Sequence, residues 1–444
     1  MSPMVDAPIR EGALRIIRAL TERGHRALLA GGCVRDMRLG RAPKDWDVAT
    51  DAGPEDVVRL FDRVLPIGVE FGIVTVVLED GHYEVARFRR DGPYQDGRHP
   101  DHTEIAAPEE DARRRDFTIN GMFYDPLEER LIDYVGGEGD LQRQLVRAIG
   151  NPRQRFEEDF LRMLRAVRFA ARLGFALEPA TAAAIAESSG KISSVSAERI
   201  RDELTLILTE GAPAFGMGLL MQLGLMQAVL PEVAATQGVP QPPEYHPEGD
   251  VWSHVQLMLD KLDAPSATLA WGVLLHDIGK PPTFARADRI RFNGHDARGA
   301  EMAAAIGHRL RLPKVEGEKI RELTAQHMRF GNVKEMRASK LKRFLRQPIF
   351  PELLELHRVD CLASHGKLDL YEFCREKSAE AGEEGLRPLR LVTGHDLIGM
   401  GLEPGPRLGE ILQWVEDEQL EGRLADRKTA LAAVELKYLA SKQE

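Results

Sequence analysis

The apolar residues of this chain change their spacing near residue 141, and this change limits the fold more than any other feature. Before it, short apolar runs such as Ala27–Ala30 end in turn signals, and Val74–Leu78 and His82–Phe88 flank a turn at Asp80-Gly81 that is typical of a hairpin. After it, apolar residues recur every three to four positions, as in helices. The sequence therefore predicts an α/β head followed by an all-α body.

The length also predicts several domains. The chain has 444 residues, which is too many for one ordinary core. A proline-rich stretch at 237–247 is typical of a stiff connector. We expect boundaries that divide the chain into residues 1–145, 146–236, 237–375 and 376–444.

Composition excludes several classes of protein. The three cysteines, Cys33, Cys361 and Cys374, are far apart and odd in number, which argues against a disulfide scaffold and favours a reducing compartment. No apolar run approaches the roughly 20 residues that span a bilayer. The net charge of −10 argues against a generic polyanion binder, although arginines cluster at 113–115 and 162–172. We therefore expect a cytoplasmic protein without a membrane partner.

Two aspartates in the head have the spacing of a metal site. Asp45 and Asp47 fall in an expected strand at 45–50, where alternate residues share a face. Two carboxylates on one face repel each other unless a cation lies between them, and Mg²⁺ prefers carboxylates with substrate phosphates. Gly31-Gly32 stands at a strand-to-helix junction, where backbone amides can approach phosphate closely. Glu84, in the second arm of the hairpin, is a candidate third carboxylate.

Five motifs in order resemble the bacterial tRNA CCA-adding and poly(A) polymerase family. They are Gly31–Asp36, Asp45–Asp47, Arg114–Asn120, Asp133–Gly137 with Asp140-Leu141, and Glu158–Arg162 with Arg165-Ala166. The resemblance covers about residues 28 to 200 and implies a polymerase-beta-like nucleotidyltransferase head with helical neck, body and tail regions. It also implies template-independent addition of C, C and A, from CTP and ATP, to the 3′ end of tRNA.

The resemblance assigns roles to single residues. Asp45 and Asp47 would hold Mg²⁺, with Glu84 as the third catalytic carboxylate. The residues that would bind the nucleotide are Gly32, Arg35, Arg114, Asp116, Asn120, Asp159, Arg162 and Arg165.

Asp159 and Arg162 would read the base. They stand three apart on an expected helix, so they would lie side by side. The carboxylate only accepts hydrogen bonds and the guanidinium only donates them, which matches the amino group and ring nitrogen of cytosine and adenine but not uracil or guanine. The alternative is an ordinary surface ion pair.

A second constellation lies in the helical body. It consists of His254, His276-Asp277, His295, His327 and Asp360. Imidazoles with carboxylates suit Mn, Ni, Co, Zn or Fe. The order resembles the HD-domain phosphohydrolases, in which His254, His276, Asp277 and Asp360 would be the minimal metal set and the other two histidines would allow a second ion. The resemblance implies action on phosphomonoesters or cyclic phosphodiesters.

Rival interpretations remain at this point. Within the class they are an enzyme that adds only A, one that adds only CC, and a poly(A) polymerase. The stretch 91–112 is long enough for the flexible loop that the family needs to switch from C to A. Outside the class, the chain could be a phosphohydrolase with an RNA-binding head, or an RNA-binding protein without catalysis. We expect tRNA, ATP and CTP as partners and infer no obligate protein partner.

Overall fold

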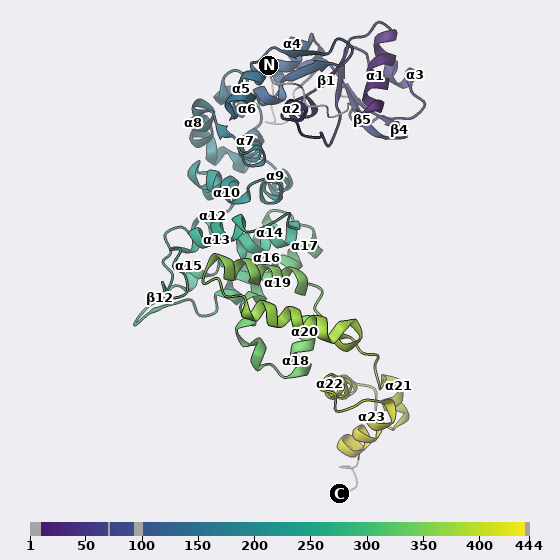
Figure 1. Ribbon diagram of the computed structural model, residues 1–444, viewed down its shortest axis with the longest axis vertical. Coiled ribbons are helices and arrows are strands. Elements are labelled where there is room, and N and C mark those ends of the chain that lie inside the picture. The colour runs from purple at the N-terminus through teal and green to yellow at the C-terminus, as the bar shows by residue number, and fades with distance from the viewer. Residues whose placement is uncertain (1–9, 70–71, 93–100, 440–444) are drawn as a thin grey trace. The chain divides into compact units, whose positions relative to one another are not determined.

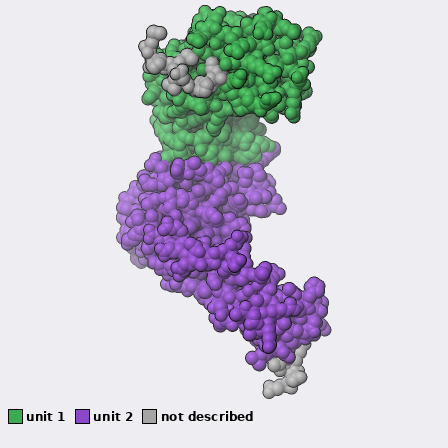
Figure 2. All heavy atoms as spheres, turned by 45° about the vertical axis from the view of Figure 1, so that its right-hand side comes forward, with its two compact units in different colours: residues 1–234 green, residues 235–444 purple. Residues whose placement is uncertain are grey.

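The computed structural model describes residues 10–69, 72–92 and 101–439. The chain divides into two compact units, residues 1–234 and residues 235–444 (Figure 2). In the part of the chain that the structure describes, no helix is long and apolar enough to cross a membrane.

A seven-stranded mixed sheet forms the head within unit 1 (Figure 1). Its strands are β1 (Ala27–Ala30), β2 (Val48–Thr50), β3 (Val64–Leu65), β4 (Ile73–Leu78), β5 (Gly81–Arg87), β8 (Met122–Asp125) and β9 (Arg130–Asp133). Their order is β3-β4-β5-β2-β1-β8-β9, and β2 and β5 are parallel while the other neighbours are antiparallel. On one face, Leu28, Phe88 and Phe123 form a buried cluster, with the two aromatic rings edge to face at 5.8 Å.

The local predictions for the head agree with the structure except at one strand. Strand β1 and the β4–β5 hairpin lie where the apolar pattern placed them, and helix α1 (Glu11–Glu22) precedes β1. The strand expected at 45–50 is wrong at its start, because β2 begins only at Val48. Its partner β1 ends at Ala30, whose amide still donates to the Asp47 carbonyl over 3.0 Å. Beyond that bond β1 turns into a helix and offers no further partner.

Helices complete unit 1. They are α2 (Gly32–Arg38), α3 (Pro54–Leu60), α4 (Pro108–Arg114), α5 (Gly137–Arg143), α6 (Pro152–Glu158), α7 (Leu161–Leu173), α8 (Pro179–Ser188), α9 (Ala197–Thr209), α10 (Pro213–Gln222), α11 (Leu225–Val229) and α12 (Pro231–Ala234). Two strand pairs accompany them, β6 (Arg89–Asp91) with β7 (Thr103–Ile105) and β10 (Leu145–Val146) with β11 (Ala176–Leu177). Part of the expected loop at 91–112 falls at 93–100, outside the described residues.

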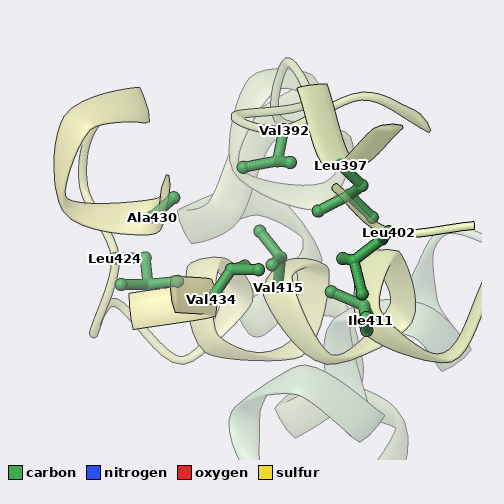
Figure 3. Close-up of a cluster of buried hydrophobic side chains, with 8 residues drawn as sticks. All are labelled: Val392, Leu397, Leu402, Ile411, Val415, Leu424, Ala430 and Val434. Atoms are coloured by element: carbon green, nitrogen blue, oxygen red, sulfur yellow. The ribbon is translucent and has the colours of Figure 1, made fainter. Parts of the chain in front are cut away.

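Within its described residues, 235–439, unit 2 is helical apart from one short ribbon. Its helices are α13 (Val251–Asp260), α14 (Ala267–Leu275), α15 (Lys280–Thr283), α16 (His295–Arg309), α17 (Lys314–Gln326), α18 (Ala338–Leu345), α19 (Phe350–Ala363), α20 (Asp369–Leu386), α21 (Gly394–Gly399), α22 (Pro406–Leu420) and α23 (Arg427–Val434). The ribbon pairs β12 (Ala285–Arg286) with β13 (Ile290–Arg291). Leu397, Ile411 and Val434 belong to a separate apolar cluster at the C-terminal end of the unit (Figure 3).

All three cysteines are free and buried. Cys33 lies in α2, Cys361 in α19 and Cys374 in α20. Burial raises the pKa of Cys33 and Cys374 to about 11 and that of Cys361 to about 12. The thiols are therefore protonated at neutral pH, which fits a packing role.

Candidate nucleotide and metal sites

One cavity of about 700 Å³ in unit 1 gathers most of the head residues singled out from the sequence. Ten of its lining side chains are basic and six are acidic. The lining includes Asp45, Asp47 and all of the expected nucleotide-binding residues, namely Gly32, Arg35, Arg114, Asp116, Asn120, Asp159, Arg162 and Arg165. Such a concentration of cations in an acidic chain suits a polyphosphate.

The glycine turn forms one wall of this cavity. Gly31 has φ +73°, a left-handed conformation that favours glycine. A Cβ atom there would lie 2.8 Å from Arg115 Nη1, the end of a flexible side chain, so the backbone angle is what requires glycine. Helix α2 begins at Gly32, directly beyond this turn.

Arg35 is placed differently from a free phosphate-binding cation. Its side chain is buried, and its Nε donates to Asp36 Oδ1 over 2.8 Å. Its Nη1 donates to Asn120 Oδ1 over 2.7 Å. Arg35 therefore fixes the orientation of Asn120, while its own charge is balanced by Asp36.

Three carboxylates act on one another at the start of β2. The parallel register pairs Val48 with Val85, which places Asp47 beside Glu84 on the neighbouring strand. Burial raises the pKa of Asp47 to about 6, and the negative charges of Glu84 and Asp45 add to this rise while Arg115 opposes it. Glu84 is not among the cavity-lining residues, although its charge reaches Asp47. Repulsion of this kind is relieved by a bound cation, although the described structure does not bring ligand atoms of all three carboxylates within 4.8 Å of one another.

An ion pair joins the head to the helices of the same unit. Asp116 Oδ2 accepts hydrogen bonds from Arg165 Nε and Nη2 over 2.9 and 2.8 Å. Burial would raise the pKa of Asp116, but Arg165 holds it below its ordinary value. Glu203 lies 3.6 Å from the other side of Arg165. Arg114, in turn, donates to Asp111 from Nε over 2.8 Å.

The two expected base readers do not share a helix, and that prediction is wrong. Helix α6 ends at Glu158 and α7 begins at Leu161, and Asp159 between them has extended backbone angles. Asp159 Oδ1 accepts from the Leu161 amide over 3.0 Å, so the side chain caps the start of α7 and stabilises the break.

Asp159 and Arg162 each already have a hydrogen-bonding partner within the protein. Asp159 Oδ2 accepts from Arg199 Nη2 over 2.6 Å. Arg162 Nη1 donates to the Arg155 carbonyl over 2.9 Å and pairs with Glu158. Both side chains nevertheless line the cavity.

The six residues of the second constellation converge in unit 2. His254 lies on α13, His276 and Asp277 follow α14, His295 begins α16, His327 follows α17, and Asp360 lies on α19. The ligand atoms of His254, His276 and Asp360 lie within 4.8 Å of one another, and so do those of Asp277, His295 and His327. The adjacent pair His276-Asp277 thus supplies one residue to each set.

Hydrogen bonds fix which nitrogen each imidazole offers. Nδ1 of His276, His295 and His327 lies 2.9, 2.8 and 2.7 Å from the carbonyl oxygens of residues 273, 292 and 324, respectively. Because a carbonyl only accepts, each Nδ1 carries a proton, and in the neutral ring Nε2 keeps the lone pair that can bind a metal. Nδ1 of His254 instead lies 2.6 Å from Oε1 of Glu248.

The Nε2 atoms and the carboxylate oxygens beside them fit a metal better than they fit one another. Nε2 of His295 and Nε2 of His327 lie only 3.2 Å apart, and Asp277 Oδ1 lies 3.5 and 3.7 Å from them. Two lone pairs at that distance repel unless a proton or a cation lies between them. His254 Nε2 is buried without a hydrogen bond, 3.1 Å from Asp360 Oδ1. Both sets therefore have the chemistry and spacing of ligands for divalent metals.

Charge in this centre is strongly coupled. Burial would raise the pKa of Asp277, but His276 and Lys280 hold it well below its ordinary value. Lys280 Nζ lies 2.6 Å from Asp277 Oδ2. Burial, together with the charge of His276, lowers the pKa of His327 to about 4, so this imidazole is neutral at pH 7 as a metal ligand must be.

Four family models match consecutive parts of the chain. They are the poly A polymerase head domain at residues 27–147, the probable RNA and SrmB-binding site of polymerase A at 174–236, the HD domain at 249–364 and tRNA nucleotidyltransferase domain 2 at 389–434. The CCA-adding enzyme of Bacillus subtilis (strain 168) is 32% identical over 94% of this chain and 95% of its own length. The chain belongs to the CCA-adding enzyme family. The counterpart from Lactobacillus johnsonii is 30% identical over 94% of this chain and 95% of its own length.

Solved structures of CCA-adding enzymes share the fold. The Bacillus stearothermophilus enzyme in complex with CTP matches with a TM-score of 0.73 and 25% identity over 100% of both chains. The Thermotoga maritima enzyme complexed with tRNA matches with a TM-score of 0.62 and 19% identity over 99% of this chain and 97% of that one. The expected fold class, an α/β nucleotidyltransferase head followed by a helical body with an HD domain, is confirmed.

For this CCA-adding enzyme family member, residue patterns missed several side chains at both sites. At the nucleotide cavity, Arg199 on α9 received no role from the sequence, although it holds Asp159. In the HD domain, His246 lies in the proline-rich stretch that was interpreted only as a connector, and Glu248 directly follows that stretch. Lys280 follows the His-Asp pair closely, and a cation three residues from a buried carboxylate could have been noticed.

Proposed function

We propose that this chain is a tRNA nucleotidyltransferase that adds C, C and A in turn to the 3′ end of tRNA. It uses CTP and ATP, takes the terminal 3′-hydroxyl as nucleophile and releases pyrophosphate. The observation that carries the proposal is the cavity of unit 1, which combines paired carboxylates, a glycine turn and ten basic side chains. Two relatives that match nearly the whole chain are named CCA-adding enzymes, and they support the same activity.

The head residues divide the work of nucleotidyl transfer. Asp45 and Asp47, with Glu84 as the third carboxylate, hold Mg²⁺. Bound Mg²⁺ supplies charge neutralisation at the attacking and leaving oxygens. Arg114 and the amides of the glycine turn hold the triphosphate. Because Arg35 donates to the side-chain oxygen of Asn120, the side-chain nitrogen of Asn120 is the atom that donates to the ribose or phosphate.

Base choice in this proposal needs no nucleic-acid template. Asp159 accepts the exocyclic amino group of cytosine or adenine, and Arg162 donates to the adjacent ring nitrogen. Each carboxylate oxygen has two lone pairs, so Asp159 can keep Arg199 while it accepts from the base. With uracil or guanine, Asp159 would face another hydrogen-bond acceptor and Arg162 another donor. Each unpaired group costs about 1–3 kcal/mol.

The HD domain gives a second activity. We infer a phosphohydrolase that acts on phosphomonoesters or 2′,3′-cyclic phosphates, because two adjoining ligand sets of imidazole and carboxylate are typical of such centres. Bound Mn, Ni, Co, Zn or Fe supplies an activated water for attack on phosphorus. Asp277 contributes to the second set and His276 to the first, so the pair ties the two sets together.

The proposal also assigns the regions of the chain. Residues 1–145 form the nucleotidyltransferase head, 146–236 the neck and body that bind base and RNA, 237–375 the HD domain and 376–444 the tail. The enzyme acts in the cytoplasm, where tRNA, ATP and CTP are present.

Three tRNA transcripts test the main proposal. They end before the first C, after the first C and after the second C, and each is incubated with one labelled nucleotide at a time. We expect two additions from CTP on the shortest transcript and one from ATP only on the transcript that ends in CC. Addition of A alone, arrest after CC, or long A tracts would instead identify an A-adding enzyme, a CC-adding enzyme or a poly(A) polymerase.

A further inference from the structure

The four histidines of the HD centre differ in what holds them. His276, His295 and His327 each present Nδ1 to a backbone carbonyl. His254 alone among the four presents Nδ1 to a carboxylate, that of Glu248, at 2.6 Å. Glu248 lies between the proline-rich stretch and α13 and has no role in the motif that identifies the centre. Its side chain is only 6% exposed.

Glu248 is held through one oxygen, Oε1, while its other oxygen, Oε2, is buried with no hydrogen-bond partner in the described part of the chain. His246 Nδ1 lies 2.9 Å from the same oxygen, Oε1, and the rings of His246 and His254 meet edge to face at 4.9 Å. Asp250, two residues on, caps α13 by accepting from the Ser253 amide over 2.8 Å. Asp250 thus holds the segment that follows Glu248 to the start of the helix that carries His254.

A carboxylate does more for a ligating imidazole than a carbonyl does. Both fix the Nδ1–H tautomer and the ring plane. A charged acceptor also makes a stronger hydrogen bond and increases electron donation from the opposite nitrogen. In His254 that nitrogen is Nε2, which is buried without a hydrogen bond beside Asp360.

We propose that Glu248 is a positioning residue that orients His254 and strengthens its Nε2 as a metal ligand, with His246 holding the carboxylate in turn. The proposal rests on the HD phosphohydrolase function inferred above. It concerns one ligand set only, that of His254, His276 and Asp360, because the second set contains no residue that contacts Glu248 in the described hydrogen bonds.

The same geometry admits one rival. Ligand atoms of His246, Glu248 and His254 also lie within 4.8 Å of one another, which is the spacing of a further metal site. However, both contacts to Oε1 have hydrogen-bond lengths, and a metal on Nδ1 of His254 would remove the proton that Glu248 accepts. The rival therefore predicts one more bound ion, whereas positioning predicts none.

Cobalt binding to the full chain separates these possibilities. The chain carries Asp45→Ala and Asp47→Ala, which remove the proposed head ligands, and Co²⁺ is followed by calorimetry and by its visible absorption. His254→Ala and His327→Ala identify which binding step belongs to which set. We expect Glu248→Gln, which keeps the shape but not the charge, to weaken the His254 step by about 10–100-fold and to leave the His327 step unchanged.

The matched control is Glu352→Gln. Glu352 is a carboxylate of the same unit that accepts from the hydroxyls of Ser266 and Thr268 over 2.6 and 2.7 Å, away from the centre. It should change neither step. Rescue of the His254 step by Glu248→Asp to an intermediate affinity would support positioning through charge.

Four results would overturn the proposal. An unchanged His254 step in Glu248→Gln would show that the carboxylate has no effect on the ligand. Equal weakening of both steps with lower melting would show a merely structural role. Loss of a third equivalent of Co²⁺ would identify a metal site at Glu248 itself. If the unchanged HD centre bound no Co²⁺ at all, the proposed phosphohydrolase would fail with it, which is distinct from the first result.

Discussion

Asparagine in place of Asp47 is expected to stabilise the metal-free head above pH 7 while abolishing nucleotide addition. Burial, with the charges of Glu84 and Asp45, raises the pKa of Asp47 from 3.8 to about 6. The folded state therefore binds this proton more tightly than the unfolded chain does. Stability from this group is fully present below about pH 4 and is lost as the pH rises through 6.

The size of the effect follows from the shift. At about 1.4 kcal/mol per pKa unit, an ionised Asp47 costs the folded head roughly 3 kcal/mol at pH 8. At pH 5 the cost falls to about half, because the folded group is then mostly protonated. The Asp47→Asn variant has no ionisable group at this position, so this cost is absent from it at either pH. Mg²⁺ should raise the stability of the parent chain and leave the variant nearly unchanged.

Hydrogen exchange of the β1 and β2 amides in urea measures the free energy of unfolding of the head. A local probe is needed because a chain of two units need not unfold in one step. Asp51→Asn is the matched control. Asp51 follows the same strand, outside the cavity, and accepts from His25 Nδ1 and the Arg26 amide over 3.2 and 3.0 Å. We expect that variant to lose stability and to keep nucleotide addition. Equal stability of Asp47→Asn and the parent at pH 8, or a gap that widens toward pH 5, would refute the reasoning.

Four further substitutions test other parts of the structure. Arg199→Met frees the proposed base-reading carboxylate, and we expect the preference for CTP and ATP over UTP and GTP to fall by about tenfold in single-turnover incorporation, from the loss of one charged hydrogen bond; unchanged ratios would show that Arg199 has no part in selection. Asp277→Ala should abolish hydrolysis of a 2′,3′-cyclic phosphate with Mn²⁺ or Ni²⁺ and spare CCA addition with Mg²⁺, and Asp45→Ala should do the reverse; loss of both activities in either folded variant would mean one shared centre. Gly279→Ala would drive a Cβ atom into the His295 carbonyl oxygen, so overpacking should destabilise unit 2 by about 1–3 kcal/mol, and an unchanged melting curve would contradict the close approach.

The parts of the fold that were predicted from the sequence are those that local chemistry determines. The strand at Ala27–Ala30 is followed by Gly31, whose left-handed angle only glycine adopts easily, so the turn into α2 could be predicted from the sequence. The Asp80-Gly81 turn specified the hairpin for the same reason. The start of β2 could not be predicted from the sequence, because it depends on where its partner β1 ends.

The break at Asp159 shows why the base-reading geometry was predicted wrongly. Apolar residues continue with helical spacing on both sides of it, so periodicity indicates one helix. The break is stabilised by the cap from Asp159 to the Leu161 amide and by the ion pair to Arg199 on α9. A partner 40 residues away leaves no local signal. Glu248 stands only six residues before His254, and it was missed because the proline-rich stretch beside it was interpreted only as a connector.

The buried thiols make unfolding of each unit measurable without engineering. Alkylating reagents attack the thiolate, and none of the three thiols can ionise near neutral pH while it stays packed. Modification must therefore wait for a transient opening of the surrounding structure. Because Cys33 lies in unit 1 and Cys361 and Cys374 lie in unit 2, pulsed alkylation read by mass spectrometry would time the openings of the two units separately in a single sample.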